Sequence, residues 1–170
     1  MALVLTAACS GGGGTPAPTE APLQSTEVFT LPPSAPSAAA WPDGWEDICL
    51  ALTELQTGWS DFTDALDDAE AFDYDSASKE AKSAGSHAKT AVGVLDGLPT
   101  WTPGKGIVGD LRTAATNMQK AGNLLSLGLK NIDADLVDEV APYVDKINDA
   151  LDDGIVDETD INATYGFGCS

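Results

Sequence analysis

Basic side chains are scarce in this sequence, and histidine is almost absent. The chain of 170 residues carries 8 Lys and Arg against 27 Asp and Glu, a formal net charge of −19, and it has a single histidine. Such a charge repels the phosphates of nucleic acids and the headgroups of anionic lipids. We therefore expect no nucleic-acid partner. A solvated acidic surface is the simplest interpretation, and cationic partners or loosely held divalent cations are the alternatives.

Long apolar runs and catalytic constellations are missing as well. No stretch beyond the N-terminus approaches the ~18 uninterrupted apolar residues that a membrane-spanning helix requires. The one histidine, His87, has no Asp or Cys at ligand spacing, whereas nucleophilic triads and zinc sites need such partners. We expect His87 to be a packing residue. The sequence predicts neither an enzyme nor a cofactor, and it offers no catalytic residue.

The N-terminus is an apolar run that ends at a cysteine. Met1 to Ala8 are small or apolar up to Cys9, and Ser10 and four glycines follow. This pattern resembles the lipobox of bacterial lipoproteins, with the difference that Thr6 stands where leucine is most usual. The resemblance implies cleavage just before Cys9, a diacylglyceryl group on the Cys9 thiol, and attachment to a membrane through the acyl chains.

Residues 1–8 are accordingly predicted to be the end of a truncated signal peptide. They lack the basic start and the full apolar region of ~7–15 residues that a signal peptide has, so we expect the natural start to lie upstream. The composition, rich in Ala, Asp and Gly and poor in Lys, is typical of an actinobacterial source. We therefore expect an extracytoplasmic protein, lipid-anchored to the outer face of the cytoplasmic membrane.

Residues 9–40 are predicted to be a lipidated, disordered tether. They consist mainly of Gly, Pro, Ser, Thr and Ala, a composition that cannot bury enough apolar surface to offset the entropy of ordering. A flexible coil of about thirty residues has a root-mean-square reach of roughly 30 Å. The tether would hold the following domain away from the membrane.

Residues 41–170 are predicted to form one α-helical domain. Asp43 is the expected N-cap of its first helix, with Glu46 as the capping-box partner. Apolar or small residues then recur at spacings of three and four on four successive segments, as one face of an amphipathic helix requires. The four stripes are Trp45, Ile48, Leu52, Leu55, Trp59, Phe62, Leu66 and Ala69; Ala77, Ala81, Ala84, Ala88, Ala91 and Leu95; Val108, Leu111, Ala115, Met118, Gly122, Leu125, Leu129 and Ile132; and Leu136, Val140, Val144, Ile147 and Leu151.

Local signals divide the four segments. The first is broken at residues 72–75, the second is capped near Asp75 and ends before Pro99, and the third begins with Thr102 as cap and ends near residue 131. The fourth is capped by Asp133 or Asp135 and is kinked at Pro142. Short connections of this kind predict an antiparallel up-and-down four-helix bundle, followed by an irregular tail after residue 154.

Cysteine occurs three times, and an odd number in an exported protein leaves one thiol to be explained. Cys9 is the predicted lipidation site. Cys49 lies on the first helix and Cys169 lies in the C-terminal tail, which would not need a cysteine if it were free. We predict a disulfide between these two that folds the tail back across the bundle.

Two sets of residues are candidates for a binding site. Asp149, Asp153, Asp157 and Asp160 partly match a calcium loop, but a leucine occupies a ligand position and the segment shares the periodicity of the fourth helix. The expectation is therefore that no metal site forms. Trp41 and Trp101 are the candidate anchors for a docking partner.

The leading hypothesis is a non-enzymatic protein-interaction module at the cell envelope, attached to the membrane by its lipid and binding another envelope protein. The alternative is a lipoprotein that binds a small ligand or an ion, calcium included. A concave apolar pocket among the helices would favour this alternative. An accessory or inhibitor of an enzyme would share the features of the first hypothesis.

Overall fold

The computed structural model describes residues 42–169, which fold into four long helices and two short ones. The predicted signal peptide, Cys9, the predicted tether and Trp41 lie outside the described residues. The elements in chain order are α1 (Trp45–Glu70), α2 (Tyr74–Asp96), the 3-10 helix η1 (Thr102–Gly104), α3 (Lys105–Asn131), α4 (Ala134–Asp138) and α5 (Ala141–Tyr165).

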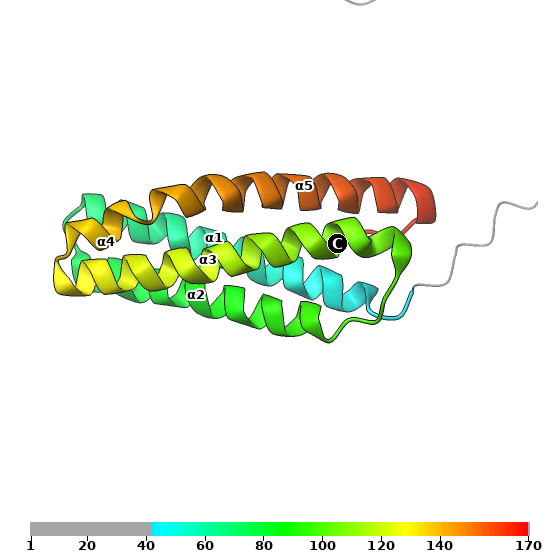
Figure 1. The fold of residues 1–170 in the computed structure, drawn as a ribbon, viewed down its shortest axis with the longest axis horizontal. Helices are drawn as coiled ribbons and strands as arrows, with labels where there is room; N and C mark the ends of the chain where they lie inside the picture. The colour runs from blue at the N-terminus through cyan, green and yellow to red at the C-terminus, as the bar shows by residue number, and fades with distance from the viewer. Residues whose placement is uncertain (1–41, 170) are drawn as a thin grey trace, which may run out of the picture. The chain divides into compact units, whose positions relative to one another are not determined.

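The predicted all-α, up-and-down four-helix bundle is confirmed. Consecutive long helices run antiparallel, with α1 packed on α2, α2 on α3, and α3 on α5 (Figure 1). The largest fully buried side chains form one core, in which every long helix but α2 contributes bulky residues and α2 contributes alanines and one leucine. Within residues 42–169, no helix has both the length and the hydropathy that a bilayer crossing requires.

Small residues bring α2 and α3 into backbone contact. The alanine stripe predicted for the second helix is fully buried. A Cβ at Gly122 of α3 would lie 2.6 Å from the carbonyl oxygen of Ala81 and 2.9 Å from the backbone nitrogen of Gly85. Across the same interface, the hydroxyl groups of Ser78 and Ser126 each donate to the other's carbonyl oxygen, at 3.0 and 2.9 Å. The interface therefore has no room for a larger side chain.

Three of the predicted helix caps differ in the structure. Thr102, predicted to cap the third helix, instead begins η1, and the N-cap of α3 is Gly104, which makes no side-chain cap hydrogen bond. The N-cap of α1 is Gly44, not Asp43, and it makes no side-chain cap hydrogen bond. Gly44 adopts a φ of 92°, and a Cβ there would lie 2.8 Å from Leu98, so the tight fit against the α2–α3 connection selects glycine. The N-cap of α2 is Asp73, whose side chain accepts a hydrogen bond from the backbone of Ser76 at 3.2 Å.

Pro142 divides the predicted fourth helix instead of kinking it. The chain forms the short α4, whose N-cap is Asp133 as predicted, and then starts α5 with Pro142 in its first turn. A proline is tolerated there because the N–H groups of the first turn have no partner within the helix.

The boundary predicted at residue 154 is wrong as well, because α5 continues to Tyr165. Gly154 lies buried inside α5, where a Cβ would approach Leu111 of α3 to 3.0 Å. Close packing of α5 on α3 therefore offsets the roughly 1 kcal/mol that a glycine costs in a helix interior. Only the residues after Tyr165 form an irregular tail.

The predicted disulfide between Cys49 and Cys169 is present, with the two Cα atoms 5.2 Å apart. The tail that it holds is well packed. Phe167 is 2% exposed and packs against both Trp45 and Trp101, with ring centroids 5.8 and 6.2 Å away. The backbone N–H of Cys169 also donates to the carboxylate of Glu158 at 3.0 Å. The disulfide thus holds the C-terminal tail, with its buried Phe167 ring, against the start of α1.

Replacing both disulfide cysteines, in Cys49→Ser/Cys169→Ser, is expected to lower the free energy of unfolding by about 4–5 kcal/mol. The bond joins residues separated by 120 positions, so its loss releases a long loop in the unfolded chain. Equilibrium unfolding in urea measures the change. Cys9→Ser serves as the control and should leave the unfolding curve unchanged. A loss below about 1 kcal/mol would mean that the aromatic contacts hold the tail without covalent help.

Candidate functional site

An apolar groove lies at the end of the bundle where α1 meets α2 and α3 meets α4, opposite the start of α1. We call it the distal groove. Its volume is about 470 Å³, within the range of known ligand pockets, and its walls are mainly apolar. The lining residues are Leu66, Ala69 and Glu70 of α1, Tyr74 of α2, Gly128 and Leu129 of α3, and Ile132, Asp133, Ala134, Val137 and Asp138 of the α3–α4 turn and α4.

The position of α4 forms one wall of the distal groove. A Cβ at Gly128 would lie 2.8 Å from Val137 and 3.1 Å from the carbonyl oxygen of Asp133, so glycine allows α4 to fold back tightly on the end of α3. Asp133 stabilises this position because its carboxylate accepts hydrogen bonds from the backbone of Asp135 and Leu136, at 3.2 and 3.4 Å. The close approach to Gly128 and the Asp133 cap therefore hold α4 in the position that forms this wall of the groove.

Helices α1 and α3 end at this groove in the same way. The backbone N–H of Asp73 donates to the carbonyl oxygen of Asp68 at 2.9 Å, and the backbone N–H of Asp133 donates to the carbonyl oxygen of Gly128 at 2.8 Å. These bonds close a Schellman turn at each helix end. In this turn the residue directly before the donating N–H takes a left-handed conformation and is usually glycine. Here the residues are Phe72, with φ 63°, and Ile132, with φ 53°.

Phe72 and Ile132 combine backbone strain with exposure. They are the two non-glycine residues with positive φ within residues 42–169, and bulky side chains are costly in that region. They are also the most exposed large hydrophobic residues there, at 78% and 80%. Ile132 borders the groove, and Phe72 contacts the groove residue Tyr74 edge-on at 6.3 Å. Such strain persists where a site needs the side chain.

Charge distinguishes the rim of the distal groove from its walls. Glu70, Asp133 and Asp138 are the charged residues among those that line it, and no Lys or Arg is among them. All three carboxylates are exposed. The groove therefore presents an apolar surface within a negative border.

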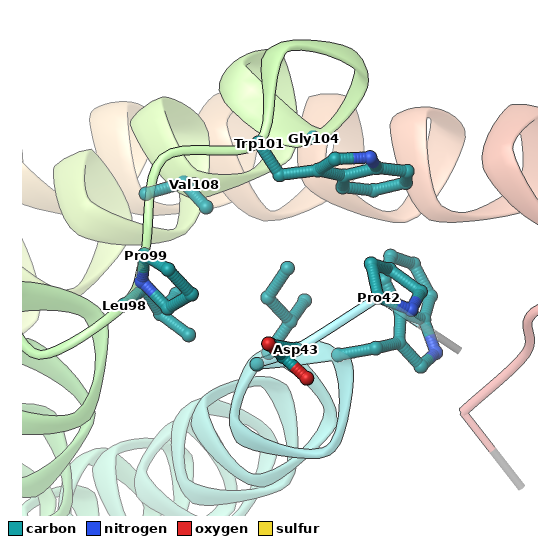
Figure 2. Close-up of a pocket in the computed structure, with 10 residues that line it drawn as sticks. Pro42, Asp43, Leu98, Pro99, Trp101, Gly104 and Val108 are labelled. Atoms are coloured by element: carbon teal, nitrogen blue, oxygen red, sulfur yellow. The ribbon is translucent and has the colours of Figure 1, made fainter. Parts of the chain in front are cut away.

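The opposite end of the bundle is closed. Trp101 lies over a cavity of about 20 Å³ that Pro42, Leu98, Pro99 and Val108 also line (Figure 2). This space holds about one water molecule and no larger ligand. Trp101, predicted as a docking anchor, packs edge-on against Trp45 at 6.0 Å and is part of the internal aromatic cluster.

His87 is held between two carboxylates of α1. Its Nδ1 lies 2.7 Å from Glu54 and its Nε2 lies 3.6 Å from Asp61, and all three side chains are half-buried. Gly58 permits this contact, since a Cβ there would lie 3.1 Å from the Cβ of His87. The histidine joins α1 to α2 as a packing residue and does not line the distal groove.

The four aspartates of the partial calcium motif lie on a continuous helix. Asp149, Asp153, Asp157 and Asp160 all belong to α5, so the residues between them do not form the loop that calcium requires. Asp157 and Asp160 border a surface hollow of about 240 Å³ beside η1. Among residues 42–169, no cluster of three or more His, Cys, Asp or Glu is arranged to hold a metal ion.

Asp110 of α3 lies against Asp153 and Asp157 of α5. Burial raises the pKa of Asp110 above its ordinary value of 3.8, and the negative charges of Asp157 and Asp153 and a hydrogen bond with Asp157 raise this pKa further. Three carboxylates thus face one another where two helices pack. Their repulsion opposes the packing of α5 on α3.

Sequence reasoning missed the distal groove. It placed Ile132 on the inward stripe of the third helix and treated Phe72 only as part of a helix break. The available signal was the presence of bulky apolar residues in two short helix connections, where glycine is usual. No protein-family model, curated protein or solved structure matches the chain.

Phe72→Gly and Ile132→Gly are each expected to raise the free energy of unfolding by about 0.5–1 kcal/mol. A left-handed conformation costs a non-glycine residue roughly 1–2 kcal/mol, and the larger entropy of glycine in the unfolded chain returns part of the gain. Urea unfolding measures the change. Phe72→Ala and Ile132→Ala are the controls, because they remove the side chain but keep the strain. Equal effects of glycine and alanine would contradict the prediction.

Asp110→Asn is expected to stabilise the protein at neutral pH. The folded-state pKa of Asp110 is raised, so its favourable contribution is complete below 3.8 and is lost as the pH rises through the raised value. The gain from the variant should therefore shrink as the pH falls toward 3.8. Thermal unfolding across this range measures it. Asp152→Asn, an exposed change on α5, controls for net charge, and an equal gain there would refute the assignment.

Proposed function

We propose that this chain is a lipid-anchored extracytoplasmic protein whose helical bundle acts as a non-enzymatic protein-interaction module at the cell envelope. Cys9 would carry the lipid on the outer face of the cytoplasmic membrane. Residues 9–40 would form the tether, and the bundle would bind another envelope protein.

The exposed apolar end of the bundle is the observation that carries the proposal. Phe72 and Ile132 stand in solvent beside the distal groove on a chain that is otherwise strongly acidic. Exposed apolar surface with a polar border is typical of protein interaction sites.

The disulfide supports a location outside the cytoplasm. Disulfides persist in oxidising compartments and are rare in the cytosol. With Cys49 and Cys169 joined, Cys9 is the third cysteine of the sequence, and its apolar, small-residue context resembles a lipobox. Two acyl chains on one cysteine are enough for stable attachment to a bilayer.

A small-ligand-binding lipoprotein is the second candidate function. The distal groove favours it, because a volume of about 470 Å³ with apolar walls and a few polar groups suits a small molecule. The groove is open to the surface at Ile132, and Phe72 extends its apolar surface through Tyr74. Exposed apolar side chains beside the groove fit a protein partner better than an enclosed ligand, so the interaction module is our first choice.

Cys9→Ser, placed behind a complete leader peptide, is expected to move the protein from the membrane fraction to the soluble fraction and to abolish the mass of the acyl groups. The reason is that the bilayer holds the protein through acyl chains on this thiol. Cell fractionation and intact mass spectrometry measure the two effects.

The Cys49→Ser/Cys169→Ser variant is the matched control, since it removes cysteines without removing the anchor and should remain with the membranes. Membrane association of the Cys9→Ser protein, or native protein without acyl mass, would overturn the anchoring.

A further inference from the structure

We propose that the distal groove binds a segment of a partner protein that carries a bulky apolar side chain next to Lys or Arg. This inference rests on the proposed interaction module and names the chemistry of its partner. The apolar side chain would enter the groove between α1 and α4. The basic residues would face the carboxylates at its rim.

The walls of the distal groove determine the apolar part of this ligand. Leu66, Leu129 and Val137 come from three different helices and converge on one hollow, together with the ring of Tyr74. A bulky side chain that enters such a hollow is removed from contact with water, as the anchor residues of an interface are. Grooves between helices commonly receive a partner in this way.

The strained residues indicate that the surface around the hollow is used. Glycine would relieve the left-handed backbone at Phe72 and at Ile132, and neither side chain contributes to the buried core. Both residues therefore destabilise the folded chain by backbone strain, and the burial of their side chains does not offset this strain. Contact with a partner would offset it, since that contact buries the exposed ring and the exposed aliphatic chain beside the groove.

The charges determine the basic part of the ligand. Glu70 of α1, Asp133 of the α3–α4 turn and Asp138 of α4 all line the groove, and its lining includes no Lys or Arg. The net charge of −19 extends this negative field over the whole chain and attracts cationic segments. The same field repels a second copy of the chain and an anionic bilayer, so we favour a basic protein segment over both.

The distal groove lies far from the first described residue of the chain. Pro42, where the described chain begins, packs beside the start of α1, and the groove includes the last turn of the same helix. The 26 residues of α1 separate the two ends by about 40 Å at 1.5 Å per residue. The groove therefore lies at the opposite end of α1 from Pro42, the first described residue.

The test is selection of short random peptides on phage against the full 170-residue chain, oxidised and purified without detergent, followed by calorimetry with the enriched peptides. We expect enrichment of peptides with a bulky apolar residue next to Lys or Arg. Their binding should weaken by about tenfold or more in Phe72→Gly and in Ile132→Gly, because both remove anchor surface. These variants should be at least as stable as the native chain, so lost binding would not reflect lost folding.

Charge and position have separate controls. Glu70→Gln/Asp138→Asn should weaken the same peptides by a few-fold and reduce the salt dependence of binding, since both changes remove rim carboxylates. Val156→Ala removes an exposed apolar side chain from α5, away from the groove, and should leave binding unchanged.

Several outcomes would overturn the inference. They are no enrichment, enrichment of acidic peptides, or binding that the groove variants do not affect. In the last case the interaction module would stand and only the groove assignment would fail. Three further results name other occupants and also refute it: self-association abolished by Phe72→Gly, binding of the chain to phosphatidylglycerol vesicles through Ile132, or a bound small molecule in native mass spectrometry of protein purified from the envelope.

Discussion

The backbone contact between α2 and α3 is the constraint on which the rest of the structure depends. Because Gly122 meets the backbone at Ala81 and Gly85, the two helices lie as close as their main chains allow. The alanine stripe of α2 leaves no space at this interface, and α1 and α5 pack from the two sides with larger residues. A bundle centred on such a contact places its ligand-sized hollows outside the central interface.

The two ends of the bundle then have different roles. At the start of α1, Trp45, Trp101 and Phe167 fill the available space, and the disulfide holds the tail over them. At the other end, two helices stop with strained apolar residues in solvent, and α4 borders an open groove. The contacts at the first end stabilise the fold, whereas the strained residues at the second end lower the stability and expose apolar surface.

The acidic side chains act both between copies of the chain and within the bundle. The large negative charge opposes association of the exposed apolar end with other copies of the chain. It also has a cost inside the molecule, where Asp110 faces Asp153 and Asp157 across the α3–α5 contact. At the α1–α2 contact, by contrast, His87 favours packing, because it joins two carboxylates of α1 to α2.

The sequence by itself determined the number of long helices, most of each inward stripe and the cysteine pairing, because periodicity and cysteine count are local or additive properties. Tertiary structure alone decided that Gly154 stays helical, that Pro142 begins a new helix, and that Gly44 replaces Asp43 as the cap. Each of these depends on how closely another helix or loop approaches. The distal groove has the same origin: Ile132 continues the inward periodicity, but the chain turns there so that α4 can pack on Gly128, and this turn carries the side chain into solvent.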